Sequence, residues 1–368
     1  MNDNKTLFSQ TVLQFMGPVR EFLEDDEVSE VMVNGPDKIY IEKAGRLIKT
    51  DRRFSSPQSL MAAIRNVSQF VGRTIDFNTP YLDARLPDGS RVHAMIEPVA
   101  RKGPYLTIRR FFSDLLTIDD LIRLGSLPQP VARFLEACVL ARKNIVVSGG
   151  TGSGKTTLLN VLSAFIPEHE RIIVIEDASE LQLRQEHVLP LETKRPDAKG
   201  RGEVSIRDLV RNSLRMRPDR IVVGECRGGE ALDMLQAMNT GHSGSLTTVH
   251  ANSARDALSR LETLCLMSGV DMPLTAVRGQ VASALELIVQ IARFPDGTRK
   301  LTEVSEVLSL DQGGNYQVNR LFEFELEGKD PESGKVSGRL KSLGNRPTFL
   351  RELGLTGVEL DPELFGAA

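Results

Sequence analysis

The sequence has no tryptophan, only 4 tyrosines among its 368 residues, and an aromatic fraction of 5%. Proteins that bind single-stranded nucleic acid usually stack bases on aromatic side chains, and such platforms are scarce here. An excess of positive charge is also missing, since 46 lysines and arginines stand against 49 acidic residues and the net charge is −3. Dedicated nucleic-acid binders are usually strongly basic. These absences argue against nucleic acid as the main partner, although they leave a local basic groove open.

Cysteine is rare as well. Cys138, Cys226 and Cys265 stand far apart and without metal-ligand spacing, which argues against a disulfide framework or a zinc site and fits a reducing compartment. No uninterrupted apolar run approaches the roughly 18 residues of a membrane span. The segment after Met1 lacks the apolar core of a signal peptide. We therefore expect a soluble, cytoplasmic protein that meets a membrane only through partners.

The first part of the chain predicts a small α+β domain over residues 1–112. Glycine follows asparagine at Asn34-Gly35 and alanine at Ala44-Gly45, and both pairs lie between alternating segments, which is typical of hairpin turns. The expected elements are a helix at 11–23, strands at 30–33, 38–42 and after 45, a helix at 56–71, a hairpin of 83–86 and 90–96, and a strand at 105–109.

A linker is expected at 113–127, and a second domain over 128–368. Apolar strands alternate there with amphipathic helices, which favours a mostly parallel sheet covered by helices on both faces. The expected elements are a helix at 129–141, strands at 144–148, 171–175, 220–223, 245–250 and 286–292, and a hairpin of 301–310 and 316–326. The tail after Gly328 gives no clear fold signal.

Residues 149–156, Gly-Gly-Thr-Gly-Ser-Gly-Lys-Thr, match the phosphate-binding pattern G-x-x-x-x-G-K-[ST] in full. An apolar strand precedes the motif and a helix at 156–166 follows it, so backbone N–H groups would surround a phosphate at the start of that helix. Lys155 would bridge the β- and γ-phosphates of ATP, and the Thr156 hydroxyl would bind Mg²⁺. The alternative is a glycine-rich turn with an accidental lysine. The residues expected to bind the nucleotide are Gly150, Thr151, Gly152, Ser153, Gly154, Lys155, Thr156 and Thr157.

Acidic residues follow two apolar strands of the second domain. Glu176 ends the first strand, with Asp177 and Glu180 close behind, and Glu225 ends the second. The carboxyl ends of parallel strands form the edge where ligands bind in open α/β sheets. One acid there can hold the water shell of Mg²⁺ while another polarises the attacking water. The alternative is that these acids are solvated strand ends or partners of nearby arginines.

Two histidines, His242 and His250, bracket a further core strand. A histidine at a strand end could sense the γ-phosphate or relay its loss to a neighbouring subunit. The plainer interpretation is a hydrogen-bonded core residue.

Three arginines, Arg207, Arg211 and Arg215, recur at every fourth position and so share one helix face. They are either a solvated basic stripe or part of a subunit interface. Arg217, Arg220 and Arg227 add to the supply of positive charge that phosphoryl transfer needs.

Four blocks now stand in order: the loop at 149–156, Ile-Glu-Asp-Ala-Ser-Glu at 175–180, Arg-Pro-Asp-Arg-Ile-Val-Val-Gly-Glu-Cys-Arg at 217–227, and the segment 241–252. Together they resemble the Walker A, Asp box, Walker B and His box of the secretion ATPase superfamily, which drives type II and type IV secretion and type IV pili. Segments 31–36, 83–92 and 106–111 resemble the tight-adherence (Flp-type, type IVc) pilus branch. The similarity runs from about residue 17 to 325.

The resemblance implies a RecA-like P-loop NTPase domain preceded by a smaller α+β, PAS-like domain. It implies a homo-hexameric motor that binds ATP and Mg²⁺, hydrolyses ATP, and works with an inner-membrane platform protein to drive pilus assembly or secretion. Two alternatives stay open: a hexameric nucleic-acid translocase or helicase, and a nucleotide-gated structural ring with little turnover. Metal-spaced cysteines and a long segment ahead of the first domain, present in some relatives, are absent, so the docking mode is open.

Roles carry over onto matching positions. The catalytic candidates are Glu176, Glu225 and Lys155, and the supporting residues are Asp177, Glu180, His242, His250 and Arg227. In the superfamily, arginines of the first domain reach toward the nucleotide phosphates, and the positions that match that region are Arg85, Arg91, Arg109 and Arg110.

Overall fold

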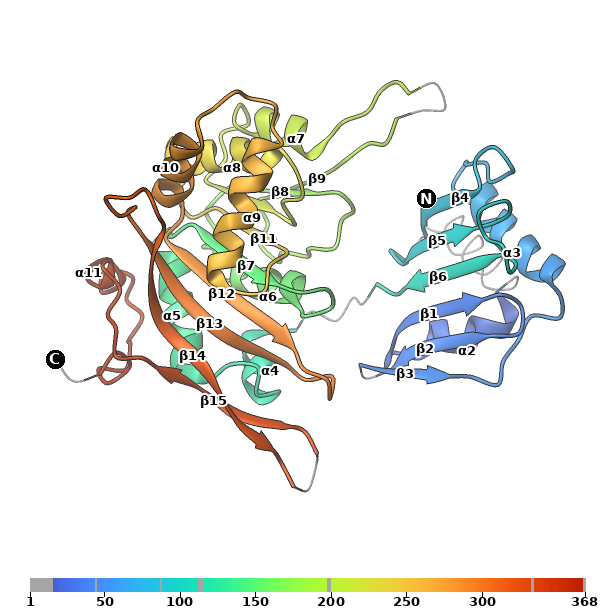
Figure 1. The fold of residues 1–368 in the computed structure, drawn as a ribbon, viewed down its shortest axis with the longest axis horizontal. Coiled ribbons are helices and arrows are strands. Elements are labelled where there is room, and N and C mark those ends of the chain that lie inside the picture. Colours follow the sequence, from blue (N-terminus) through green and yellow to red (C-terminus); the bar gives the residue numbers. More distant parts are fainter. Residues whose placement is uncertain are drawn as a thin grey trace. The chain divides into compact units, whose positions relative to one another are not determined.

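The computed structural model describes residues 16–43, 45–86, 88–111, 116–196, 200–331 and 334–366. The chain divides into two units, residues 1–114 and 115–368, whose helices and strands are labelled in Figure 1. Each unit has a hydrophobic core of its own. Residues 11–15 of the expected first helix lie outside the described residues.

The first unit is an antiparallel sheet with helices. Its strands stand in the order β3-β2-β1-β6-β5-β4, and α3 packs on the sheet through Leu60, Ile64 and Val67. Ser56 caps α3 in a capping box with Ser59, which fixes where the helix begins. In chain order the elements are η1 (Gly17–Val19), α2 (Arg20–Glu24), β1 (Val28–Asn34), β2 (Ile39–Lys43), β3 (Arg46–Lys49), α3 (Pro57–Phe70), β4 (Tyr81–Arg85), β5 (Arg91–Met95) and β6 (Tyr105–Arg109).

The second unit is built on a larger sheet with the strand order β15-β14-β13-β12-β7-β11-β10-β8-β9. The strands from β12 to β9 are parallel to their neighbours, and β13 to β15 continue the sheet as antiparallel strands. One face packs on α5 and α6, and the other on α8, α9 and α10. Helices therefore cover both faces, as the alternating pattern predicted.

The elements of this unit are α4 (Ile118–Arg123), α5 (Gln129–Leu140), β7 (Ile145–Gly149), α6 (Lys155–Ser163), β8 (Ile172–Glu176), β9 (Val188–Glu192), α7 (Ile206–Ser213), β10 (Arg220–Val223), α8 (Glu230–Asn239), β11 (Leu246–Val249), α9 (Ala254–Leu266), α10 (Leu274–Ala284), β12 (Leu287–Arg293), β13 (Arg299–Leu308), β14 (Gln317–Lys329), β15 (Val336–Ser342) and α11 (Leu350–Leu353).

Two segments of the second unit differ from expectation. Within the predicted linker, Thr117 caps α4, and Leu121 is buried in the core of the second unit. The strand β9 contains Pro190 and has a half-exposed side-chain pattern, so its sequence lacks the apolar run of a central strand. It lies at the sheet edge, where a proline is tolerated.

The tail that carried no fold signal is part of the second unit. Phe365 packs against Phe134 and Phe322, with ring centroids 5.4 and 5.6 Å away. The buried Lys143 ammonium pairs with Glu352 at 2.5 Å and lies over the ring of Phe349. These partners come from α5, β14 and the end of the chain, and only the fold brings them together.

Across the described ranges, none of the helices has the length and apolar content needed to cross a membrane.

Candidate nucleotide-binding site

Four parallel strands deliver the predicted site residues to one edge of the large sheet. The P-loop follows β7, His250 follows β11, Glu225 lies just beyond β10, and Glu176 ends β8. Since the strands stand in the order β7-β11-β10-β8, these residues line up in that sequence along the edge. All four strands are fully buried, so a ligand can be reached only by the residues at or just beyond the strand ends.

The P-loop has the backbone that a phosphate cradle requires. Gly152 and Gly154 have φ angles of +67° and +95°, a region that residues with a Cβ rarely adopt. A Cβ on Gly149 would stand 2.4 Å from the Ile291 carbonyl oxygen and 2.6 Å from Ser153 Oγ. The first-turn N–H groups of α6 have no partners within the helix, and the helix has no side-chain cap. The loop therefore fits a nucleotide phosphate.

The Lys155 side chain connects the P-loop with the neighbouring strand ends. Its Nζ donates to the Gly150 carbonyl oxygen at 3.0 Å and lies 3.2 Å from His250 Nε2. The same imidazole nitrogen lies 3.0 Å from Glu225 Oε1. Arg227 holds the other oxygen, Glu225 Oε2, through Nε at 2.8 Å and Nη2 at 2.7 Å. A continuous polar chain thus runs from the P-loop lysine to the acid after β10.

Two groups of this polar chain, His250 and Arg227, have shifted pKa values. Burial, and then the positive charge of Lys155, lower the pKa of His250 below its ordinary value. The imidazole is therefore neutral at pH 7, and Nε2 can accept from Lys155. The hydrogen bond to Glu225 raises the pKa of Arg227, and the nearby carboxylates of Asp177 and Glu180 act in the same direction.

Glu176 is the most enclosed of the predicted acids, with 4% of its surface exposed. Its Oε1 accepts the backbone N–H groups of Glu180 at 2.9 Å and Leu181 at 3.0 Å. On the other side, a Cβ on Gly224 would stand 3.0 Å from Glu176 Cγ. The carboxylate is therefore fixed between the turn after β8 and the glycine before Glu225.

The two predicted histidines lie at opposite ends of β11. His250 follows the strand at the P-loop edge, whereas His242 precedes it, and its carbonyl accepts from Ser245 Oγ at 2.8 Å. Because parallel neighbours share one carboxyl edge, His242 is at the amino edge, away from Lys155 in the same chain. The two histidines thus bracket β11 as the sequence predicted, and within one chain only His250 lies beside the P-loop lysine.

Two arginines that the sequence analysis missed lie against the P-loop. Arg299 Nε donates to the Gly152 carbonyl oxygen at 3.0 Å, and Arg293 Nη1 would stand 3.2 Å from a Cβ on that glycine. They face each other across the β12–β13 hairpin. The only signal in the sequence is a basic residue on each side of an Asp-Gly turn, which is common in surface hairpins.

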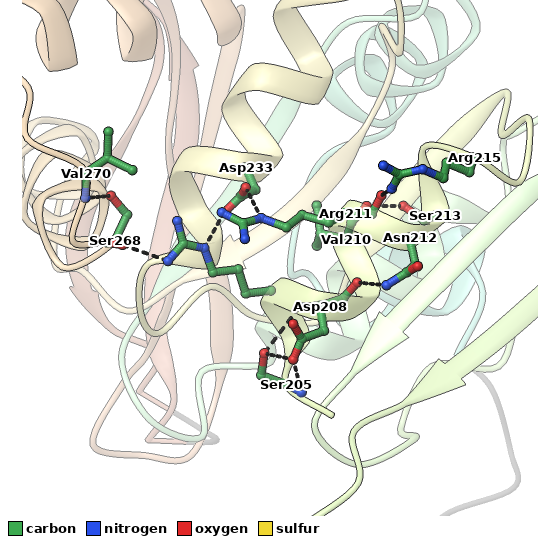
Figure 2. Close-up of polar contacts among 11 residues, drawn as sticks. Ser205, Asp208, Val210, Arg211, Asn212, Ser213, Arg215, Asp233, Ser268 and Val270 are labelled. Carbon is green, nitrogen blue, oxygen red and sulfur yellow. Dashed lines mark hydrogen bonds and ion pairs between the residues drawn. The ribbon is translucent and has the colours of Figure 1, made fainter. Parts of the chain in front are cut away.

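The basic face of α7 is held within its own chain (Figure 2). The Asp233 carboxylate of α8 accepts from Arg207 Nε and Arg211 Nε, both at 2.7 Å. Arg207 Nη1 also donates to the Ser268 carbonyl oxygen at 2.6 Å, which ties α7 to the turn after α9. Arg215 donates to the Arg211 carbonyl oxygen at 3.2 Å. The stripe is therefore paired within its own chain, and its place at a subunit interface stays a prediction.

Arg220 was counted among the arginines supplying charge for phosphoryl transfer, and that prediction is wrong. Its side chain is fully buried and pairs with Glu170, with Nε 2.5 Å from Oε2. Its Nη1 donates to the Gly244 carbonyl oxygen at 3.1 Å. Arg220 therefore joins the start of β10 to the turn before β11 and cannot reach a nucleotide.

In the first unit the register separates the four candidate arginines. Arg85 pairs with Arg91, and Arg91 with Arg109, so these three stand side by side on one face of the sheet. Arg110 points to the other face. It donates to the carbonyl oxygens of Asp25 and Val28, and only 11% of its side chain is exposed. Arg110 is thus committed to the fold of the unit, and its prediction as a phosphate contact is not supported by its placement.

Comparison with known proteins places this geometry in context. Residues 13–320 match the family described as Type II/IV secretion system protein. A putative conjugal transfer protein of Mycobacterium tuberculosis is 36% identical over 302 residues, covering 80% of this chain and 85% of that protein. The type IV secretion system protein VirB11 of Bartonella henselae is 32% identical over 344 residues, covering 83% of this chain and 96% of the relative.

Among solved structures, the Legionella pneumophila ATPase DotB superposes with a TM-score of 0.58 at 23% identity, with 82% of each chain covered. At that identity the likeness shows the fold alone. The predicted combination of a RecA-like domain with a smaller preceding domain is confirmed by it.

Proposed function

The chain belongs to the Type II/IV secretion system protein family, and from that premise we propose that it is a motor ATPase that hydrolyses ATP to ADP and phosphate to power a bacterial envelope machine. The resemblance to the secretion ATPase superfamily is confirmed by the family match and the relatives. The tight-adherence pilus branch stays a proposal, since the relatives described above are named for conjugal transfer and type IV secretion.

The observation that carries the proposal is the polar chain along the sheet edge. Lys155, His250 and Glu225 lie within hydrogen-bonding distance of one another in turn, and the P-loop beside them fits a phosphate. A plain nucleotide-binding loop needs no carboxylate on the neighbouring strands. Here the strands on that side end in acids, which is the arrangement that hydrolysis requires.

Each residue of the edge has a role in this proposal. Lys155 and the P-loop N–H groups bind the phosphates. Glu225 accepts a proton from, or orients, the attacking water, and the neutral His250 accepts from Lys155 and stands beside that carboxylate. Glu176 supplies a second, rigidly held carboxylate. Thr156 would hold Mg²⁺ through its hydroxyl, and the ion would neutralise charge that develops on the phosphates.

The arginine row of the first unit supports an anion-binding role. Arg85, Arg91 and Arg109 stand in register on neighbouring strands, and although Arg85 also donates to the Gly89 carbonyl oxygen at 3.1 Å, the row gathers positive charge that suits an anion. We assign them to a nucleotide phosphate, as the positive charge that stabilises phosphoryl transfer.

Assembly and location complete the proposal. A homo-hexamer would let each subunit relay nucleotide-driven changes to the next, with an inner-membrane platform protein as the partner that receives the motion. The chain would then be cytoplasmic and docked at the membrane through that partner. Pilus extension, with or without retraction, or protein secretion is the output.

The test is the ATPase rate as a function of protein concentration, with the mass followed by light scattering, with and without Mg·ATP. We expect turnover that rises cooperatively with the appearance of a six-subunit mass. Lys155→Ala should abolish turnover in a folded protein, while Lys329→Ala, at an exposed strand end, should not. A folded Lys155→Ala variant with the wild-type rate would refute the assignment. Strong stimulation by single-stranded DNA would favour the translocase instead.

A further inference from the structure

Residues 178–187, which connect β8 to β9, form neither helix nor strand. Their hydrogen bonds place them along α6. We call this segment the strap. Two anchors tie it to α6. Asn160 Oδ1, on the helix, accepts the backbone N–H of Gln182 at 2.9 Å. Gln185 Nε2 donates to the carbonyl oxygens of Ser163 and Ile166, each at 2.9 Å.

The anchors differ in what they satisfy. Gln185 is 6% exposed, and its amide donates to the carbonyl of Ser163, the last residue of α6, and to that of Ile166 in the turn after it. Its role is therefore explained by the stability of the helix end. Asn160 lies in the middle of α6, where helical N–H and C=O groups are already paired. Its side-chain oxygen serves the strap alone among the hydrogen bonds described for it.

The strap holds Glu176 at its other side. The N–H groups of Glu180 and Leu181 both donate to Glu176 Oε1. The next N–H group along the chain, that of Gln182, donates to Asn160 Oδ1. The hydrogen bond to Asn160 therefore fixes the backbone one residue after the Leu181 N–H that binds the carboxylate. Leu181 is also 7% exposed and packs in the same core as Leu158 of α6.

The other end of the same helix is the P-loop. α6 begins at Lys155, and Asn160 lies five positions further along, about 7.5 Å at 1.5 Å per residue. A rigid-body displacement of α6 at the phosphate end would carry Asn160 with it. The helix therefore links the phosphate cradle to the strap, and the strap to Glu176.

We propose that Asn160 is a positioning residue that sets the Glu176 carboxylate through the strap and so couples nucleotide engagement at the P-loop to that acid. The proposal rests on the function proposed above, because the kinetic consequence requires that Glu176 takes part in hydrolysis. The linkage between Asn160 and the strap does not depend on that function and can be measured separately.

Three variants on α6 separate the positioning role from general damage. Asn160→Leu keeps the size of the side chain and removes the acceptor, and we expect kcat to fall by about tenfold with KM changed by less than about twofold. Asn160→Asp keeps an acceptor oxygen and should restore most of kcat. Ser163→Ala is the control. Its buried hydroxyl, one turn further along α6, has no hydrogen-bond partner among the described residues, so its loss should change neither constant.

Two further measurements make the proposal refutable. When Glu176→Gln is already present, adding Asn160→Leu should lower kcat by a further factor of less than about two. The reason is that the effects of two substitutions that act through the same group do not add. Amide hydrogen exchange should become faster at Glu180 and Leu181 in Asn160→Leu, and stay unchanged in Ser163→Ala.

The outcomes distinguish the two proposals. Unchanged exchange at Glu180 and Leu181 overturns the linkage whatever the kinetics show. A tenfold loss in kcat that persists in the Glu176→Gln background overturns the path through Glu176. Absence of ATPase activity in the wild-type protein instead overturns the proposed function, while the exchange measurement still decides the linkage.

Discussion

Replacing Glu225 by glutamine removes one negative charge from the polar chain and leaves its shape in place. In the native protein, Oε2 accepts from Arg227 Nε and lies 2.7 Å from Arg227 Nη2, and Oε1 lies 3.0 Å from His250 Nε2. A glutamine keeps one oxygen for Arg227 and offers an amide toward the histidine. The P-loop contacts are untouched, so nucleotide affinity should stay within about threefold of wild type.

The structure separates the cost to stability from the cost to catalysis. The Arg227 side chain is 59% exposed, and solvent screening limits such a pair to about 0–1 kcal/mol. For a unit of this size that corresponds to a Tm shift of about 2–4 °C at most. Loss of a proton acceptor in the transition state typically lowers kcat by about 10²–10⁴-fold, or about 3–5 kcal/mol.

The assay combines steady-state phosphate release with equilibrium binding of a fluorescent ATP analogue and a thermal melt. The expected result is binding and melting close to wild type with kcat reduced by at least about a hundredfold. Arg227→Gln is the matched control, since it removes the partner of Glu225 and retains the carboxylate. Wild-type turnover in Glu225→Gln would refute the catalytic role, and loss of nucleotide binding would point to a role in holding Mg²⁺.

Three further predictions follow from buried or paired groups. Gly244→Ala should lower the free energy of unfolding by at least about 3 kcal/mol in urea titrations, because its Cβ would stand 1.9 Å from the buried Arg220 Nη1. The acid limb of the kcat–pH profile should have its midpoint below pH about 6.5, the ordinary histidine value, because burial and Lys155 lower the pKa of His250. Arg110→Ala should destabilise the protein by about 1–3 kcal/mol through its lost bonds to carbonyl oxygens, whereas Arg109→Ala should reduce ATPase activity with little change in the melt.

The controls for these variants come from the same elements. Gly241 also has a positive φ, +102°, but a Cβ there meets open space, so Gly241→Ala should cost only about 1–2 kcal/mol. Because folding lowers the pKa of His250, the imidazole of the unfolded chain is protonated at a higher pH than that of the folded protein. The stability that the neutral imidazole contributes is therefore complete above pH about 6.5 and falls as the pH drops below it. His250→Gln should remove both the acid limb and this dependence.

The sequence by itself determined the phosphate site. A P-loop is a contiguous run, and the residues that flank it decide its backbone, so its position and its lysine can be read directly. The acids Glu176 and Glu225 were found for a related reason, because a buried strand must be apolar and its end is the first place where a carboxylate can stand. Element bounds in the central sheet followed from the same apolar runs.

The tertiary structure decided which of these residues meet. The sequence placed His242 and His250 at the two ends of one strand, and the direction of β11 decided that His250 is the one at the P-loop edge. Cross-strand register grouped Arg85 with Arg91 and Arg109 and turned Arg110 away, since neighbouring residues on a strand face opposite sides. The sequence did not show the partners of each arginine.

Long-range partners explain the remaining differences. Arg220 looked available in sequence because its partner, Glu170, lies fifty positions away and meets it only in the folded sheet. Arg293 and Arg299 looked like surface residues because the hairpin that carries them folds back over the P-loop only when β12 pairs with β7. Local patterns fix which backbone a segment adopts, because neighbouring residues dominate that choice. The environment of a charged side chain is set by strand order and register, which depend on contacts between segments far apart in the chain.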